Sequence, residues 1–162
     1  IKNELNKFKN FKDKINFLYR PKKLSGSKTK TSSLIKYLIK KNSLDKKFFD
    51  FILLQPTSPL RKKEHIKMMW NLYKKYNLSD FFSVSERVNK FKINKTNRKI
   101  FYGEKKISLK KLRSVYQNGS IYIKNLESFK KNPSFVTRKS HLYLMSKKAS
   151  LDVDTIKDLE NN

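Results

Sequence analysis

Apolar residues along this chain alternate between two patterns. Short apolar runs bounded by turn residues predict four strands, at residues 49–54, 81–85, 120–123 and 142–145. Apolar positions at three- and four-residue spacing predict four helices, at about residues 1–11, 32–42, 63–76 and 126–131. The first of these helices leads into a short extended run at 15–19. Strands and helices in alternation predict an α/β fold with a doubly wound, mostly parallel sheet.

The stretch at 86–117 interrupts this alternation. It consists of extended, lysine-rich segments around a turn at Gly103, and it indicates an arm that projects from the domain. Asn118-Gly119 directly after it is a turn dipeptide that leads into the strand at 120–123. We therefore expect one domain over residues 1–162 with an arm inserted at 86–117.

Polar residues follow the strand at 49–54 directly, in a turn stiffened by two prolines. The ends of the strands line the ligand crevice of an open α/β sheet. We therefore expect a substrate to contact Gln55, Thr57, Ser58 and Arg61 in this turn. We expect this strand itself to be buried on both faces of a parallel sheet. A plain strand followed by a proline turn, with no binding role, is the alternative.

The C-terminal tail gathers acids in a chain that is otherwise cationic. In an extended segment, Asp152 and Asp154 fall on one side, with Leu151 and Val153 on the other. Two such carboxylates suit Mg²⁺, which binds one or two carboxylates together with substrate phosphates. The alternative is an N-capping segment, because Thr155 is followed three residues later by an acid, and both interpretations can hold at once.

Composition narrows the class of protein. The net charge of +27 invites a nucleic-acid interpretation, but only six of the 40 basic residues are arginine and the lysines are spread along the whole chain. This distribution favours non-specific adhesion to nucleic acid over a dedicated interface.

The chain has no cysteine and no apolar run near the ~20 residues of a membrane span, so we expect a cytoplasmic protein away from the membrane. His65 has no second histidine or cysteine at metal-ligand spacing, which indicates a surface or packing residue.

Three ordered motifs together resemble a known family. The chain carries Leu-Leu-Gln-Pro-Thr-Ser-Pro-Leu-Arg at 53–61, Asn-Gly-Ser-Ile-Tyr at 118–122 and Ser-Leu-Asp-Val-Asp-Thr at 150–155. In this order they resemble the acylneuraminate cytidylyltransferases, also called CMP-sialic acid synthetases, and Arg20-Pro21 matches a further family motif upstream.

The resemblance implies a fold and a reaction. The fold is Rossmann-like, of the nucleotide-diphospho-sugar transferase type, and the reaction joins CTP and a nine-carbon sugar acid, with Mg²⁺, into the CMP-sugar and pyrophosphate. The product would serve synthesis of a surface glycan, in lipopolysaccharide or capsule. The arm at 86–117 resembles the family's dimerisation segment, so a homodimer is expected.

The resemblance also implies a role for particular residues. Asp152 and Asp154 match the catalytic, metal-binding pair. The sugar-side positions match Gln55, Asn118 and Tyr122, together with Phe135 for the N-acyl group and Lys92 from the arm. Nucleotide contacts match Arg20 and Ser33, with Ser32 a possible substitute for Ser33.

Two alternatives stay open at this point. Nothing in the chain matches the Gly-rich nucleotide-binding loop with which the family begins, so an N-terminally truncated domain is expected. A catalytically inactive or partial homologue is therefore one alternative. A basic nucleic-acid-binding protein is the other.

Overall fold

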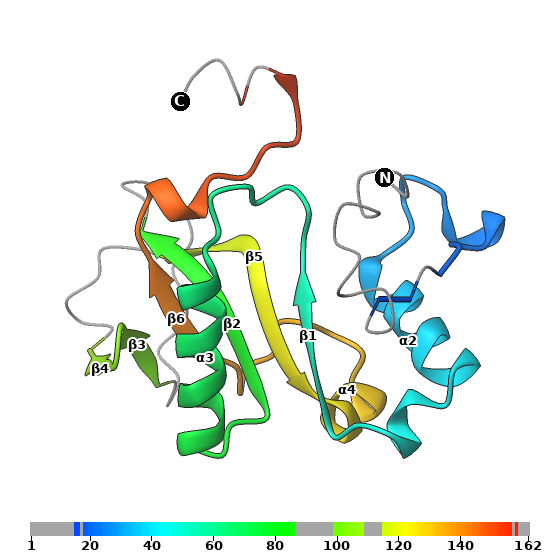
Figure 1. Ribbon diagram of the computed structural model, residues 1–162, viewed down its shortest axis with the longest axis horizontal. Coiled ribbons are helices and arrows are strands. Elements are labelled where there is room, and N and C mark those ends of the chain that lie inside the picture. Colours follow the sequence, from blue (N-terminus) through cyan, green and yellow to red (C-terminus); the bar gives the residue numbers. More distant parts are fainter. Residues whose placement is uncertain (1–14, 17, 87–98, 109–114, 157, 159–162) are drawn as a thin grey trace.

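The computed structural model describes residues 15–16, 18–86, 99–108, 115–156 and 158 as a mixed sheet with helices packed around it (Figure 1). The six strands are β1 (Asp50–Leu54), β2 (Asp80–Glu86), β3 (Ile100–Tyr102), β4 (Lys105–Ile107), β5 (Val115–Asn125) and β6 (His141–Met145). The α-helices are α2 (Thr31–Lys41), α3 (Lys63–Lys75) and α4 (Leu126–Lys131). Three short 3-10 helices complete the elements, η2 (Lys22–Leu24), η3 (Leu44–Lys46) and η5 (Lys148–Ser150).

The α/β class and most of the predicted elements are confirmed. Each of the three predicted helices that fall in the described part of the chain lies within a residue or two of its predicted bounds. The extended run predicted at 15–19 is wrong, since its described residues join no strand, and Leu18 and Tyr19 are 50% and 79% exposed. The helix predicted at 1–11 lies outside the described residues.

The sheet has the order β1-β5-β2-β6-β3-β4. Strand β6 is parallel to both of its neighbours, β2 and β3, whereas β5 is antiparallel to both β1 and β2. The expectation of a mostly parallel sheet is therefore wrong. Four strands do share one direction, but β5 is inserted between two of them in reverse, and β3–β4 forms an antiparallel hairpin at one edge.

Strand β1 lies at the other edge of the described sheet. Its single pairing is with the antiparallel β5, and its residues are half-buried or exposed along its whole length. Within the described residues, the expectation that β1 is buried on both faces of a parallel sheet is therefore wrong, because its partner is antiparallel and its side chains stay partly exposed.

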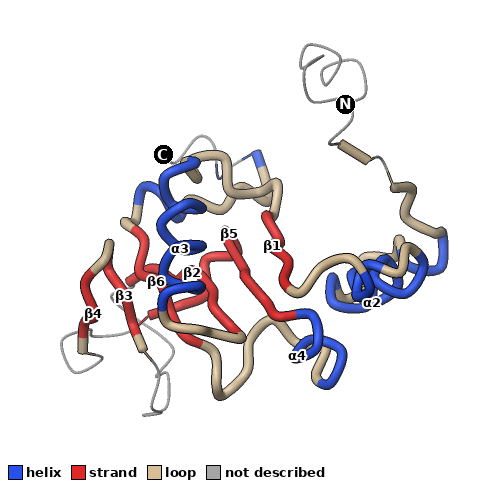
Figure 2. The backbone as a smooth tube through the Cα atoms, turned by 60° about the horizontal axis from the view of Figure 1, so that its bottom comes forward, coloured by secondary structure: helices blue, strands red, loops and turns tan. Residues whose placement is uncertain are grey.

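Side chains alternate between the two faces of the sheet, as the pleat requires. On one face, Phe81 and Ile121 pack with Met69 from α3, the helix that crosses this face in Figures 1 and 2. On the other face, Phe82 and Tyr122 join a second cluster.

The doubly wound arrangement stays a prediction. Within the described residues, none of the helices is long and apolar enough to cross a membrane.

An ion pair is buried between β2 and β5. Asp80 and Lys124 lie opposite each other in the register of the two strands, and their side chains are 4% and 1% exposed. The Thr137 hydroxyl donates a hydrogen bond to Asp80 Oδ2 at 2.7 Å. This carboxylate therefore holds two strands and the loop after α4 together.

Removing one partner of this pair should destabilise the fold strongly. We expect Asp80→Ala to lower the free energy of unfolding by about 3–5 kcal/mol, because Lys124 would keep a buried charge without its counter-charge. Replacing both residues with apolar ones, Asp80→Leu with Lys124→Met, should recover most of that loss. Urea unfolding followed by circular dichroism measures all three variants.

Lys63→Ala is the matched control, since its pair with Glu64 is 93% and 63% exposed. Its unfolding free energy should change by no more than about 0.5 kcal/mol. An Asp80→Ala variant as stable as this control would contradict the assigned role of the buried pair.

Candidate active site

A bulge in β5 forms the centre of the site. Phe82 of β2 pairs with Tyr122 of β5, and Val84 of β2 pairs with Gln117. Between these two pairs, one residue of β2 faces four residues of β5. That one residue is Ser83, and its hydroxyl donates to Asn118 Oδ1 at 2.6 Å and accepts from the Ile121 N–H at 2.9 Å. Asn118-Gly119 therefore bends β5 within the sheet, and the turn expected ahead of a separate strand is corrected to a bulge.

Asn118 fixes this bulge from inside the protein. Its side chain is 2% exposed, and its Nδ2 donates to Ser150 Oγ at 2.9 Å. Ser150 ends η5, from which the acidic tail continues. The amide of Asn118 thus faces the interior and ties the bulge to the start of the tail.

The loop after β1 reaches the same bulge. Arg61 Nη1 donates to the carbonyl oxygens of Gln55, at 2.9 Å, and Ser120, at 2.8 Å. Partial burial lowers the pKa of Arg61. The Val153 N–H donates to the Thr57 carbonyl at 2.8 Å, which joins the acidic tail to this loop. Three segments far apart in the sequence therefore meet at one place.

Gly119 is a residue of the bulge that lies close to the side chains of Gln55 and Asp152. Its φ is +72°, in the left-handed region, and a Cβ built there would lie 2.7 Å from Gln55 Oε1 and 3.6 Å from Asp152 Oδ2. The Gln55 amide and the Asp152 carboxylate thus converge over a position that only glycine leaves open.

The acidic tail shows the alternation that the sequence predicts. Asp152 and Asp154 are exposed, whereas Leu151 and Val153 are half-buried. Asp158 accepts hydrogen bonds from the Thr155 hydroxyl, at 2.8 Å, and N–H, at 2.7 Å, and these bonds lower its pKa. Asp158 therefore caps the segment at Thr155, while the carboxylates of Asp152 and Asp154 stay exposed, so both interpretations of the tail remain compatible. No third metal-binding side chain joins these two acids among the residues that the structure describes.

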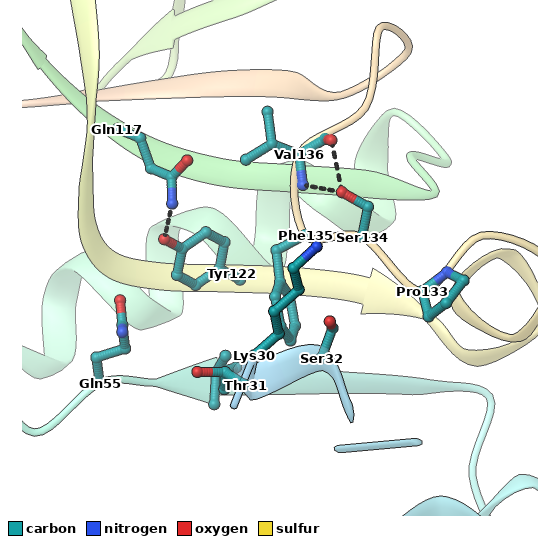
Figure 3. Close-up of a pocket in the computed structure, with 11 residues that line it drawn as sticks. Lys30, Thr31, Ser32, Gln55, Gln117, Tyr122, Pro133, Ser134, Phe135 and Val136 are labelled. Carbon is teal, nitrogen blue, oxygen red and sulfur yellow. Dashed lines mark hydrogen bonds between the residues drawn. The ribbon is translucent and has the colours of Figure 1, made fainter. Parts of the chain in front are cut away.

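A pocket of about 470 Å³ opens beside this convergence (Figure 3). Its walls come from β1, β5, the start of α2 and the loop after α4, and it is lined by Lys30, Thr31, Ser32, Leu53, Gln55, Gln117, Tyr122, Pro133, Ser134, Phe135 and Val136. The ring centroids of Tyr122 and Phe135 lie 5.2 Å apart. Burial raises the pKa of Tyr122, and the negative charge of Asp152 acts in the same direction.

The structure brings part of the predicted set together. Gln55, Tyr122 and Phe135 line the pocket, while Asp152 lies next to Gln55 over Gly119. Of the two serines weighed for the nucleotide, Ser32 lines the pocket and Ser33 does not.

Of the remaining predicted residues, none that the structure describes lines the pocket. The Asn118 side chain is internal, as described above. Arg20 does not line the pocket, and its Nε donates to the Leu24 carbonyl. Lys92 lies outside the described residues. The dimerisation arm at 86–117 is described in part only, and its role stays a prediction.

Sequence reasoning missed two polar residues of the site. Gln117 lines the pocket and donates from Nε2 to the Tyr122 hydroxyl, and Ser83 supports the bulge. Both lie within strands, where a polar residue at a single position gives no signal of a binding role. The polar position next to the Asn-Gly pair was the available hint for Gln117.

The pocket beside the sheet is the candidate site for a small molecule. No family model matches the chain. It is 36% identical over 118 residues, 67% of its length, to an N-acylneuraminate cytidylyltransferase of Streptococcus agalactiae serotype V. It is 29% identical over 151 residues, 89% of its length, to the enzyme of that name from Escherichia coli O18:K1:H7.

The chain belongs to the N-acylneuraminate cytidylyltransferase family. It spans about a third of the length of these curated relatives, 28% of the first and 35% of the second.

Gly119→Ala should test the close approach at the bulge. The new Cβ would displace the Gln55 side chain, in addition to the cost of about 1–2 kcal/mol for a left-handed alanine. Gly103→Ala is the matched control, because its φ is +56° and nothing lies within 4 Å of the built Cβ. In urea unfolding, we expect Gly119→Ala to lose more stability than Gly103→Ala. Equal losses would mean that the Gln55 contact exerts no constraint.

Proposed function

We propose that this chain forms the sugar-binding and metal-binding part of a cytidylyltransferase that activates a nine-carbon, N-acylated sugar acid. In the reaction, the anomeric hydroxyl of the sugar acid attacks the α-phosphorus of CTP. The CMP-sugar forms and pyrophosphate leaves. The observation that carries the proposal is the convergence of the loop after β1, the β5 bulge and the acidic tail beside one pocket. Membership of the family supports the choice of reaction.

The pocket has the chemistry that a polyhydroxylated acid requires. The Gln55 amide can both donate to and accept from sugar hydroxyls, and the Tyr122 hydroxyl offers a further polar contact. The Phe135 ring supplies an apolar surface for the methyl group of an N-acyl substituent. A volume of about 470 Å³ falls in the range of small-molecule sites. In this proposal Asn118 acts from the interior by fixing the bulge.

The acidic tail fits a magnesium ion. Asp152 and Asp154 present two exposed carboxylates, which is the oxygen donor set that Mg²⁺ takes together with substrate phosphates and water. A bound Mg²⁺ would neutralise charge that develops on the phosphates during transfer. The bond from the Val153 N–H to the Thr57 carbonyl joins the tail to the loop after β1, and this supports a metal site close to the pocket.

The nucleotide side of the proposal rests on fewer contacts. Ser32 is the hydroxyl that we assign to CTP, because it lines the pocket where Ser33 does not. We retain Arg20 as a second nucleotide contact on the family motif alone. A homodimer, in which Lys92 enters the partner's sugar site, and a role in surface-glycan synthesis complete the proposal.

Removing either tail carboxylate should abolish transfer without unfolding the protein. We expect Asp152→Asn and Asp154→Asn each to lower the rate of Mg²⁺-dependent pyrophosphate release from CTP and N-acetylneuraminate about 100-fold or more. Both side chains are exposed, so the unfolding midpoint should stay within a few degrees of wild type. Pyrophosphate release is followed by a coupled phosphate assay on the complete protein.

Glu127→Gln is the control, an exposed acid on α4 away from the pocket lining, and it should retain wild-type turnover. Undiminished turnover in both tail variants would refute the metal assignment. Sugar binding without any turnover in the wild-type chain would instead identify a catalytically inactive member of the family.

A further inference from the structure

Gln117 and Tyr122 meet only because β5 is bulged. In a regular strand, two residues five positions apart point to opposite faces and lie about 17 Å apart. Here the Gln117 Nε2 donates a hydrogen bond to the Tyr122 hydroxyl, and both side chains line the same pocket (Figure 3). The bulge therefore creates a contact between them that a regular strand would exclude.

The direction of this hydrogen bond decides what Tyr122 can offer to a ligand. A phenol hydroxyl has one proton to donate, and its oxygen can accept. Since Gln117 supplies the proton of the bond between them, the proton of Tyr122 remains available for another acceptor. Within the described residues, the Tyr122 hydroxyl donates to no protein group. Its proton is thus free for an acceptor in the pocket.

The ring of Tyr122 is held firmly enough for this direction to matter. It is 3% exposed, stacks on Phe82 with an interplanar angle of 23°, and packs against Phe135. Burial, together with the Asp152 charge, disfavours ionisation of the hydroxyl, so it keeps the proton that it would donate. By contrast, Gln117 is exposed, and within the described part of the chain its side chain makes no other hydrogen bond.

We propose that Gln117 is a positioning residue that sets Tyr122 as a hydrogen-bond donor to an acceptor oxygen of the bound sugar acid. The identity of the ligand rests on the proposed function, whereas the coupling between Gln117 and Tyr122 does not. Gln117 acts through the hydroxyl of Tyr122. Its contribution to binding must therefore disappear when that hydroxyl is removed.

A double-mutant cycle tests this coupling. Isothermal titration calorimetry with N-acetylneuraminate compares wild type, Gln117→Leu, Tyr122→Phe and the double variant. We expect Gln117→Leu to weaken binding about 3- to 10-fold in wild type and less than twofold in the Tyr122→Phe background. Equal losses in both backgrounds would overturn the proposal, because Gln117 would then act independently of Tyr122.

Gln117→Glu gives a sharper outcome. A carboxylate of nearly the same shape would accept the Tyr122 proton and reverse the hydrogen bond. We expect this variant to bind the sugar acid at least as weakly as Tyr122→Phe. Binding at the wild-type level would overturn the proposal. Lys36→Leu, an exposed position on α2, serves as a control for general effects of substitution and should leave affinity unchanged.

A second measurement needs no ligand. The bond from Gln117 lowers the pKa of Tyr122, so Gln117→Leu should raise the pKa of that hydroxyl further. Ultraviolet absorbance during an alkaline titration, taken as a difference from the matching Tyr122→Phe protein, isolates this one tyrosine of the eight. An unchanged titration would overturn the coupling. If wild type fails to bind N-acetylneuraminate, the proposed function fails, while this titration still decides the role of Gln117.

Discussion

The buried hydrogen bonds of Ser83 are the constraint on which the candidate site depends. A single serine on β2 bonds to Asn118 and to the backbone of Ile121, and these bonds replace part of the ladder that four residues of β5 leave. The same bulge places Gly119 under Gln55 and Asp152. It also offers the Ser120 carbonyl to Arg61. The pocket therefore takes its shape from an irregularity in one strand that Ser83 holds in place.

Two residues of β2 have different roles, one in the stability of the fold and one in the shape of the pocket. At the start of the strand, Asp80 is buried with Lys124 and accepts from Thr137, which fixes the loop that carries Phe135. In the middle of the strand, Ser83 holds the bulge. Breaking the ion pair lowers the stability of the fold, because it leaves an unpaired charge buried in a medium of low polarity. A change at the bulge instead alters the geometry of the pocket.

Local pattern predicts the elements of this fold well, whereas the sheet order and the bulge depend on contacts between distant segments. Helices such as α3 follow directly from a three- and four-residue apolar spacing. The reversed direction of β5 could not be predicted from its own residues, because strand direction is set by the connections and by the neighbouring strands. Asn-Gly was expected as a turn, and the buried partner that makes it a bulge, Ser83, lies 35 residues away.

The same distinction explains which site residues could be found. Gln55 and Tyr122 belong to ordered motifs, so a resemblance identified them as sugar-side residues. Gln117 belongs to no motif, and it reaches Tyr122 only because of the bulge. A residue that acts through the geometry of an irregular strand therefore leaves no trace in local periodicity. Positions directly beside a bulge are consequently where closely similar pockets can differ in the hydrogen bonds that they offer, while the surrounding core stays the same.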